Sequence, residues 1–186
     1  MMLSIDVEAS GPFPGLHSLC SIGAVPVVER DGRFVVDETR TFYVELAPLP
    51  GAADVPEAMA VHGLTRAHLE ANGLDPHDAM SKLAAYLKTL GGVRTASWPS
   101  SFDHPYVGWY AQRFLGRNPI GHSGFDIASF AMGLFRTTDR RVLAEAMREA
   151  GYRAPHNPHP HHALHDAIEQ GKTLAWLLGH ARASSP

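Results

Sequence analysis

Alternating apolar and polar residues at the start of the chain predict a β-strand that carries two acidic side chains on one face. Within residues 3–10, Ile5 and Val7 point to one side and Asp6 and Glu8 to the other, because successive strand side chains alternate. Neighbouring carboxylates repel each other, and a divalent cation that prefers oxygen ligands removes the repulsion. The pattern therefore predicts either a metal site at the end of this strand or a Glu8 side chain that extends into solvent.

The next apolar segments predict that this strand belongs to an antiparallel meander of three strands. Residues 19–28 are mostly apolar, and residues 34–44 contain several β-branched and aromatic residues. Asp31-Gly32, between these two segments, is a strong hairpin signal. Residues 47–54 are rich in proline and glycine and predict a loop that crosses to the next element.

The rest of the chain has a mainly helical pattern. Pro56 suits a first helical turn, Gly63 ends that short helix, and Thr65 can cap the next one. The apolar spacing predicts helices at residues 57–62, from 66 onward, 77–90, 102–115, 125–135, 140–150 and 162–178, a strand at 93–98, and a frayed end at 183–186. This order predicts an α/β fold, in which a mixed sheet carries helices on its faces.

Composition fits one globular domain of 186 residues, with 45% hydrophobic and 19% charged residues. We find neither an internal repeat nor a linker, so we expect one domain over residues 1–186 with its core at residues 3–178. No apolar run is long enough to cross a bilayer and no secretion signal is visible, so we expect no membrane association. The single cysteine, Cys20, excludes an internal disulfide, favours a cytoplasmic location and fits a buried small side chain.

The charge distribution limits the ways in which the chain can bind nucleic acid. A net charge of −3 argues against a protein that coats nucleic acid non-specifically, but it permits an enzyme that grips a short strand through metal ions. The segment of residues 136–153 has five arginines and three acidic residues. These arginines either follow the phosphates of a strand or form a solvated helix face.

Three further residues carry candidate chemistry. Asp103 follows the strand at 93–98 and starts a helix, where capping is the alternative to binding a metal. Asp166 lies off the apolar stripe of the last helix, about one and a half turns from its start, where solvent exposure is the alternative. His161 lies on the loop at the mouth of that helix, where its ring can move, and a structural role is its alternative.

Five short segments become informative when they are taken together. They are Ser4-Ile5-Asp6-Val7-Glu8, Ser21-Ile22-Gly23-Ala24-Val25, Val61-His62-Gly63-Leu64-Thr65, Phe102-Asp103 and His161-His162-Ala163-Leu164-His165-Asp166-Ala167. In this order and spacing the chain resembles the histidine subtype of the DEDD exonuclease superfamily, the family of ribonuclease T, oligoribonuclease and the proofreading subunit of bacterial DNA polymerase III. The tyrosine subtype has a tyrosine where this chain has His162. The family usually has an asparagine before the second acidic motif, and residues 97–101 here contain none.

This resemblance implies a ribonuclease H-like sheet and a metal-dependent 3′→5′ exonuclease that acts on single-stranded nucleic acid. It implies that two divalent cations, Mg²⁺ or Mn²⁺, are bound by four carboxylates, with Asp6 bridging both ions and Glu8, Asp103 and Asp166 completing the site. It also implies that His161 is the general base, a task that suits an imidazole near neutral pH. Without metal, we expect these carboxyl groups to have raised pKa values or to be disordered.

The resemblance also implies where the 3′ end of a single strand is held. The candidate substrate-binding residues are Ser10, Leu16, His17, His62 and Phe102. RNA is favoured over DNA as the substrate, because this compact form resembles the exoribonucleases more than the polymerase subunit. Small relatives are often dimers, so a homodimer is expected by analogy.

Two other functions are weighed against the exonuclease. One is a nucleic-acid-binding module on the same fold that has lost activity, although none of the expected acidic residues is missing. The other is a zinc protein that uses the histidine-rich residues 156–165, although zinc sites prefer cysteine and histidine at fixed spacings and Cys20 is distant. On the exonuclease hypothesis His156, His159 and His165 have no part in the chemistry.

Overall fold

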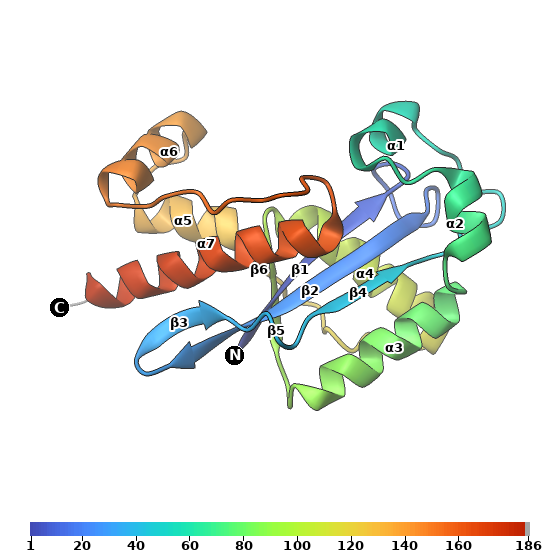
Figure 1. Ribbon diagram of the computed structural model, residues 1–186, viewed down its shortest axis with the longest axis horizontal. Coiled ribbons are helices and arrows are strands. Elements are labelled where there is room, and N and C mark those ends of the chain that lie inside the picture. Colours follow the sequence, from blue (N-terminus) through green and yellow to red (C-terminus); the bar gives the residue numbers. More distant parts are fainter. Residues whose placement is uncertain (185–186) are drawn as a thin grey trace.

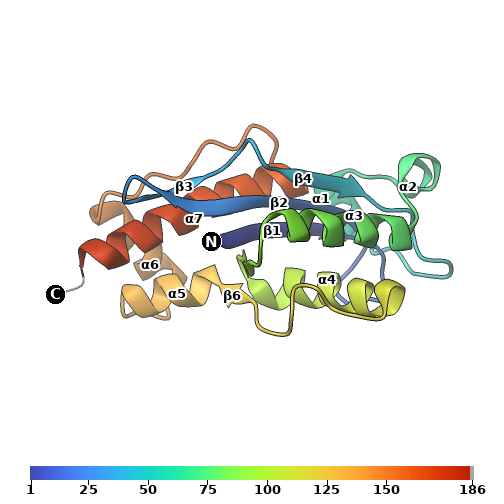
Figure 2. The same cartoon turned by 90° about the horizontal axis from the view of Figure 1, so that it is seen from below.

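The computed structural model describes residues 1–184 as a six-stranded mixed sheet covered by helices (Figures 1 and 2). The strands are β1 (Met2–Ala9), β2 (Leu19–Arg30), β3 (Arg33–Val36), β4 (Phe42–Glu45), β5 (Arg94–Ser97) and β6 (Phe125–Asp126). The helices in this described part are α1 (Pro56–His62), α2 (Arg66–Asn72), α3 (Pro76–Thr89), α4 (Ser100–Leu115), α5 (Ile127–Leu134), α6 (Arg140–Glu149) and α7 (Ala163–Ala183).

β1 lies at the centre of the sheet and joins its antiparallel and parallel halves. The strand order is β3-β2-β1-β5-β6, and β4 also pairs with β2. β2 is antiparallel to β1, β3 and β4, whereas β5 is parallel to β1 and to β6. The fold is therefore the mixed α/β sheet that the sequence predicts.

The alternation in β1 divides its side chains between the two faces of the sheet. Leu3, Ile5 and Val7 are buried in one core, together with apolar residues of α3 and α4. α7 packs across β1, β2 and β3 on the other face, where Gln170 contacts Asp6. The acidic residues of β1 thus face the last helix of the chain.

Two glycines let α7 approach the sheet closely. Gly23 is the β2 partner of Asp6, and a Cβ atom added to it would collide with the main chain of Ala163 and Leu164 at the start of α7. A Cβ atom on Gly171 would lie 3.2 Å from the Cβ atom of Ser4 in β1. The absence of these side chains allows the first turn of α7 to lie beside Asp6.

The long third strand expected at residues 34–44 is wrong, because the structure divides it into β3 and β4. Between them lies a turn built around Asp37, which is 2% exposed. The Asp37 carboxylate accepts hydrogen bonds from Thr39 and Arg40 and forms an ion pair with Arg30. This local polar network competes successfully with strand pairing.

Two helix boundaries also differ from those expected. The helix expected at residues 125–135 begins with two residues of β6, and the last helix continues to Ala183 instead of ending at residue 178. The expected frayed end is partly helical, since Ala183 closes α7, and residues 185–186 lie outside the described residues. Within the described chain, no helix combines the length and the apolar character needed to cross a bilayer.

Candidate active site

Asp6 and Glu8 lie at the carboxyl end of β1, on the face that α7 covers. Both are partly buried. The Gln170 side chain of α7 donates hydrogen bonds to Asp6 Oδ1 and to the carbonyl oxygen of Ile5, each at 3.2 Å. Glu8 therefore does not simply follow the strand into solvent, and Asp6 has a protein partner that fixes its orientation.

Asp103 joins the start of α4 to β1. It lies in the first turn of α4, is 3% exposed, and accepts a hydrogen bond from the Val7 amide at 2.9 Å. The alternative interpretation of Asp103 as a helix cap is wrong, because Pro99 occupies the cap position and the first amide of α4, that of Ser100, donates to Asp126 instead. The carboxylate instead holds the end of β1 beside the helix.

Asp166 lies in the first turn of α7, somewhat nearer the helix start than expected. Its Oδ2 atom accepts a hydrogen bond from the His161 amide at 3.0 Å, and its Oδ1 atom accepts one from Asn157 Nδ2 at 2.6 Å. The Asn157 amide also donates to Glu169 at 2.8 Å. Asn157 thereby ties the proline- and histidine-rich loop to α7 and orients the Asp166 carboxylate.

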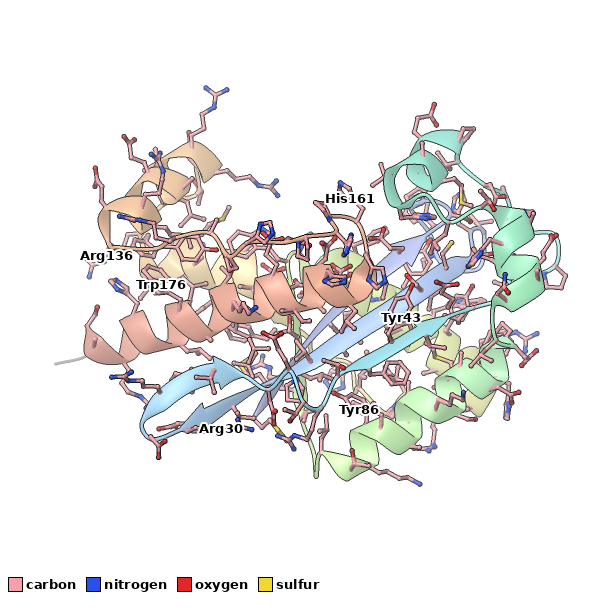
Figure 3. All side chains as sticks on the ribbon, in the orientation of Figure 1. Arg30, Tyr43, Tyr86, Arg136, His161 and Trp176 are labelled. Carbon is pink, nitrogen blue, oxygen red and sulfur yellow. The ribbon has the colours of Figure 1, made fainter. Side chains whose placement is uncertain are left out.

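The two adjacent histidines before α7 face different surroundings. His161 is exposed and has a left-handed backbone, with φ 63° (Figure 3). The His162 ring stacks on Tyr43 of β4, with 4.5 Å between ring centroids and 20° between planes. His162 Nδ1 is buried and has no hydrogen-bond partner among the described residues. His162 is therefore packed against the sheet, whereas the ring of His161 is accessible.

Burial and mutual repulsion favour the protonated forms of the acidic side chains. Burial, followed by the charges of Asp103 and Glu8, raises the pKa of Asp6 well above its usual value, against a weaker opposing effect of the Gln170 hydrogen bond. Burial and then the charge of Asp166 raise the pKa of Glu8 to about 8. Burial also raises the pKa of Asp103, and the hydrogen bond from Val7 opposes that shift. The expected electrostatic conflict is present.

This arrangement fits a divalent cation. Ligand atoms of Glu8, His161 and Asp166 lie within 4.8 Å of one another. The charges of Glu8, Asp103 and Asp166 raise the pKa of Asp6, and the charges of Asp103 and Asp166 raise that of Glu8, so all four carboxylates belong to one cluster. Gln170 Oε1 is buried beside Asp6 and lacks a hydrogen-bond partner among the described residues. Oxygen-rich, anionic sites of this kind suit Mg²⁺ or Mn²⁺.

Two other groups of metal-type side chains are less suitable. Asp75, His77 and Asp78 are all exposed, and Asp75 already caps α3. In the histidine-rich loop, His159 and His162 each lie with ring centroids 4.9 Å from the ring of His165. Among the described residues these three rings form no cluster of convergent ligand atoms. The structure therefore offers little support for a zinc site in this loop.

The predicted substrate-binding residues are distributed around the end of β1, but they differ in availability. Ser10 is 1% exposed, and its amide, carbonyl and hydroxyl groups all make hydrogen bonds within the protein. Leu16 is 67% exposed, and the His17 ring forms a hydrogen bond with the backbone of Phe13. His62 and Phe102 are partly buried. Ser10 thus holds the loop together, whereas the other four have accessible surface.

Comparison with known proteins agrees with this geometry. No family model matches the chain. The chain is 32% identical over 176 residues to the 3′-5′ DNA exonuclease Cap18 of Escherichia coli, covering 92% of this chain and 88% of that protein. It is also 32% identical over 183 residues to ribonuclease T of Yersinia enterocolitica, covering 94% of this chain and 82% of that protein.

Solved structures share the fold. The nuclease domain of 3′hExo, described as a DEDDh family member bound to rAMP, matches with a TM-score of 0.65 and 11% identity over 99% of this chain and 92% of that one. Escherichia coli exonuclease I in complex with a dT13 oligonucleotide matches with a TM-score of 0.68 and 14% identity over 95% of this chain. The present chain spans only 40% of that larger protein, and 63% of cell-death related nuclease 4.

The fold and the relatives together define a nuclease with a ribonuclease H-like sheet. The chain belongs to the DEDD family of 3′→5′ exonucleases, in its histidine subtype.

Two residues of the site were not expected from the sequence. Asn157 and Gln170 hold Asp166 and Asp6 through side-chain hydrogen bonds. Gln170 follows Asp166 by four residues, one helical turn, so the helical period could have placed it beside the site. Asn157 lies in a loop, and no periodicity of the sequence indicates its contact.

Proposed function

We propose that the chain is one exonuclease domain that removes nucleoside 5′-monophosphates from the 3′ end of single-stranded nucleic acid with the help of two divalent cations. The domain covers residues 1–186, with its core at residues 3–178. The observation that carries the proposal is the cluster of Asp6, Glu8, Asp103 and Asp166 beside an accessible His161.

In this proposal the carboxylates of Asp6, Glu8, Asp103 and Asp166 would hold the two ions, Mg²⁺ or Mn²⁺. When bound, such ions acidify a water molecule and stabilise the charge that develops on the phosphate and on the departing 3′ oxygen. The hydrogen bonds from Gln170 to Asp6 and from Asn157 to Asp166 keep the carboxylates in place. Side chains that form hydrogen bonds to metal ligands commonly increase metal affinity by orienting those ligands.

His161 is the general base in this proposal. Its imidazole accepts a proton from the attacking water as the water oxygen bonds to phosphorus, and the bond from phosphorus to the 3′ oxygen breaks. Support comes from the exposure of His161 and from its amide hydrogen bond to Asp166. The neighbouring His162 is held against Tyr43 and is less suited to the task.

The terminal nucleoside lies, in this proposal, against Leu16, His17, His62 and Phe102. Apolar and aromatic surfaces stack on any base, so the grip does not depend on sequence. The names of the relatives indicate both DNA and RNA as substrates, since one relative is a DNA exonuclease and the other is ribonuclease T. We propose that both sugars are accepted, with RNA the faster substrate.

The proposal is tested with 5′-labelled single-stranded RNA and DNA of equal sequence, incubated with Mn²⁺, with Mg²⁺ or with chelator. We expect a ladder that shortens from the 3′ end only when metal is present. His161→Ala should lower kcat by about 10²–10⁴-fold, and the matched control His162→Ala should lower it far less. Tight binding without cleavage would instead identify an inactive binding module, and equal losses in both variants would refute the role of His161.

A further inference from the structure

A cavity of about 680 Å³ opens beside the carboxylate cluster, between α6 and α7. This volume lies in the range of roughly 300–1,000 Å³ that is typical of ligand sites. The cavity lining carries charges of both signs. Asp6, Asp166 and Glu169 supply acidic groups beside His161, and Arg140, Arg148 and Arg153 supply basic groups.

The rest of the lining is largely apolar and includes two aromatic side chains. Trp98 follows β5 and Tyr152 follows α6, while Leu143 and Met147 project from α6 itself. Aromatic faces of this kind stack on nucleic-acid bases without regard to sequence. The cavity thus combines surfaces for bases with charges for phosphates.

The three arginines of the lining have no charge partner in the described part of the protein. Among the described residues, Arg140, Arg148 and Arg153 form no ion pair with a carboxylate. Arg148 donates to the carbonyl oxygen of Ala144, and Arg153 donates to main-chain carbonyl oxygens near the end of α6. All three guanidinium groups therefore retain their charge for a ligand.

The opposite side of the carboxylate cluster has a different character. α1 and α6 lie on opposite sides of the start of α7 (Figure 1). Residues 10–18 and 47–75, on the α1 side, contain a single lysine or arginine, Arg66, and it is paired with Asp54 at 2.7 Å. Large apolar side chains are also exposed on that side, namely Phe13, Leu16 and Val61.

This asymmetry gives the direction of the strand. Beyond the scissile phosphate, the 3′ side of a substrate has one nucleoside and no further phosphate, whereas the 5′ side adds a phosphate with each nucleotide. The α1 side, which has little positive charge and several exposed apolar side chains, suits the first. The arginine-lined cavity suits the second. We infer that the cavity between α6 and α7 binds the nucleotides 5′ to the scissile phosphate, with Arg140 and Arg148 contacting their phosphates and Trp98 and Tyr152 contacting their bases.

The inference rests on the proposed function. A comparison of two substrates distinguishes a failure of the inference from a failure of the proposed function. One is a dinucleotide without a 5′ phosphate, which has no phosphate to place in the cavity, and the other is a single strand of eight nucleotides. Arg140→Gln combined with Arg148→Gln should raise KM for the octamer about tenfold, and should change KM for the dinucleotide at least fivefold less. The salt dependence of log(kcat/KM) for the octamer should flatten by ~0.7 per lost phosphate contact.

The matched control is Arg141→Gln, because Arg141 is the next residue of α6, is also exposed, and does not line the cavity. It should leave both KM values near those of the wild type. Equal losses on the two substrates, or losses no larger than those of Arg141→Gln, would overturn the inference. A wild-type protein that cleaves neither substrate would instead refute the proposed function.

Discussion

At the scale of single residues, the acidic side chains are held where their charges are unfavourable. Glu8 has a pKa of about 8 because it is buried and because Asp166 and Asp103 lie near it. A structural role does not require this arrangement, since carboxylates of this kind destabilise the fold whenever they are ionised without a counter-charge. The stability of the metal-free protein is therefore lowered for the sake of the site.

This conflict predicts a pH dependence of stability. Between the usual carboxyl pKa and about 8, folded Glu8 binds more protons than unfolded Glu8, so the free energy of unfolding decreases as the pH rises through this window. With chelator present, Tm should therefore fall between pH 7 and pH 8. Glu8→Gln should show a smaller fall, and an unchanged slope in that variant would contradict the assigned pKa.

The sequence indicated the acidic residues but not all of their partners. Asp6 and Glu8 were visible from strand alternation, and Asp103 and Asp166 from family-like spacing. The bond from Gln170 to Asp6 joins residues 164 positions apart, and it depends on how α7 crosses β1. Contacts of this kind follow from tertiary packing, which local patterns do not encode.

At the scale of elements, the first turn of α7 can lie close to β2 because Gly23 of β2 has no side chain. Gly23 pairs with Asp6 in the sheet and leaves room for the main chain at Ala163. The same turn carries Asp166, and only His162 separates it from His161. A glycine in a strand thus determines how close one helix, with two site residues, can come to the others.

This packing predicts that Gly23→Ala is destabilising although the change is small. The added methyl group must displace the start of α7, and overpacking of this kind costs about 1–3 kcal/mol. Urea unfolding should show the loss, and kcat should fall with it. The matched control is Gly179→Ala, because Gly179 lies in α7 with open space around it and alanine is the better helix former. A Gly23→Ala variant as stable as the wild type would contradict the close approach.

The elements themselves were largely predictable, and the exceptions have local causes. The helices and the central strands lie close to the expected residues, because their apolar periodicity is strong. The third strand was expected to be continuous. The sequence of its polar middle does not show that Asp37 accepts hydrogen bonds from Thr39 and Arg40 and pairs with Arg30, which stabilises a turn there. Side-chain hydrogen bonding overrode β propensity at that point.

At the scale of the whole molecule, the site lies where three distant parts of the chain meet. β1 supplies Asp6 and Glu8, α4 supplies Asp103, and the loop before α7 supplies His161. Because the four carboxylates repel one another, the assembled fold is expected to gain stability when cations bind. A ligand that binds only the folded state at 100 times its Kd adds about 2.7 kcal/mol to the free energy of unfolding.

The most direct test of this account is a calorimetric titration of the metal-free protein with Mn²⁺, comparing the wild type with Asp6→Asn. The account predicts two ions per wild-type chain, proton release near pH 7.5 as the raised carboxyl groups ionise, and loss of at least one ion in the variant. Equal binding of Mn²⁺ by both proteins, or no binding of Mn²⁺ by the wild type, would contradict the central claim that the carboxylates at the end of β1 form the metal site.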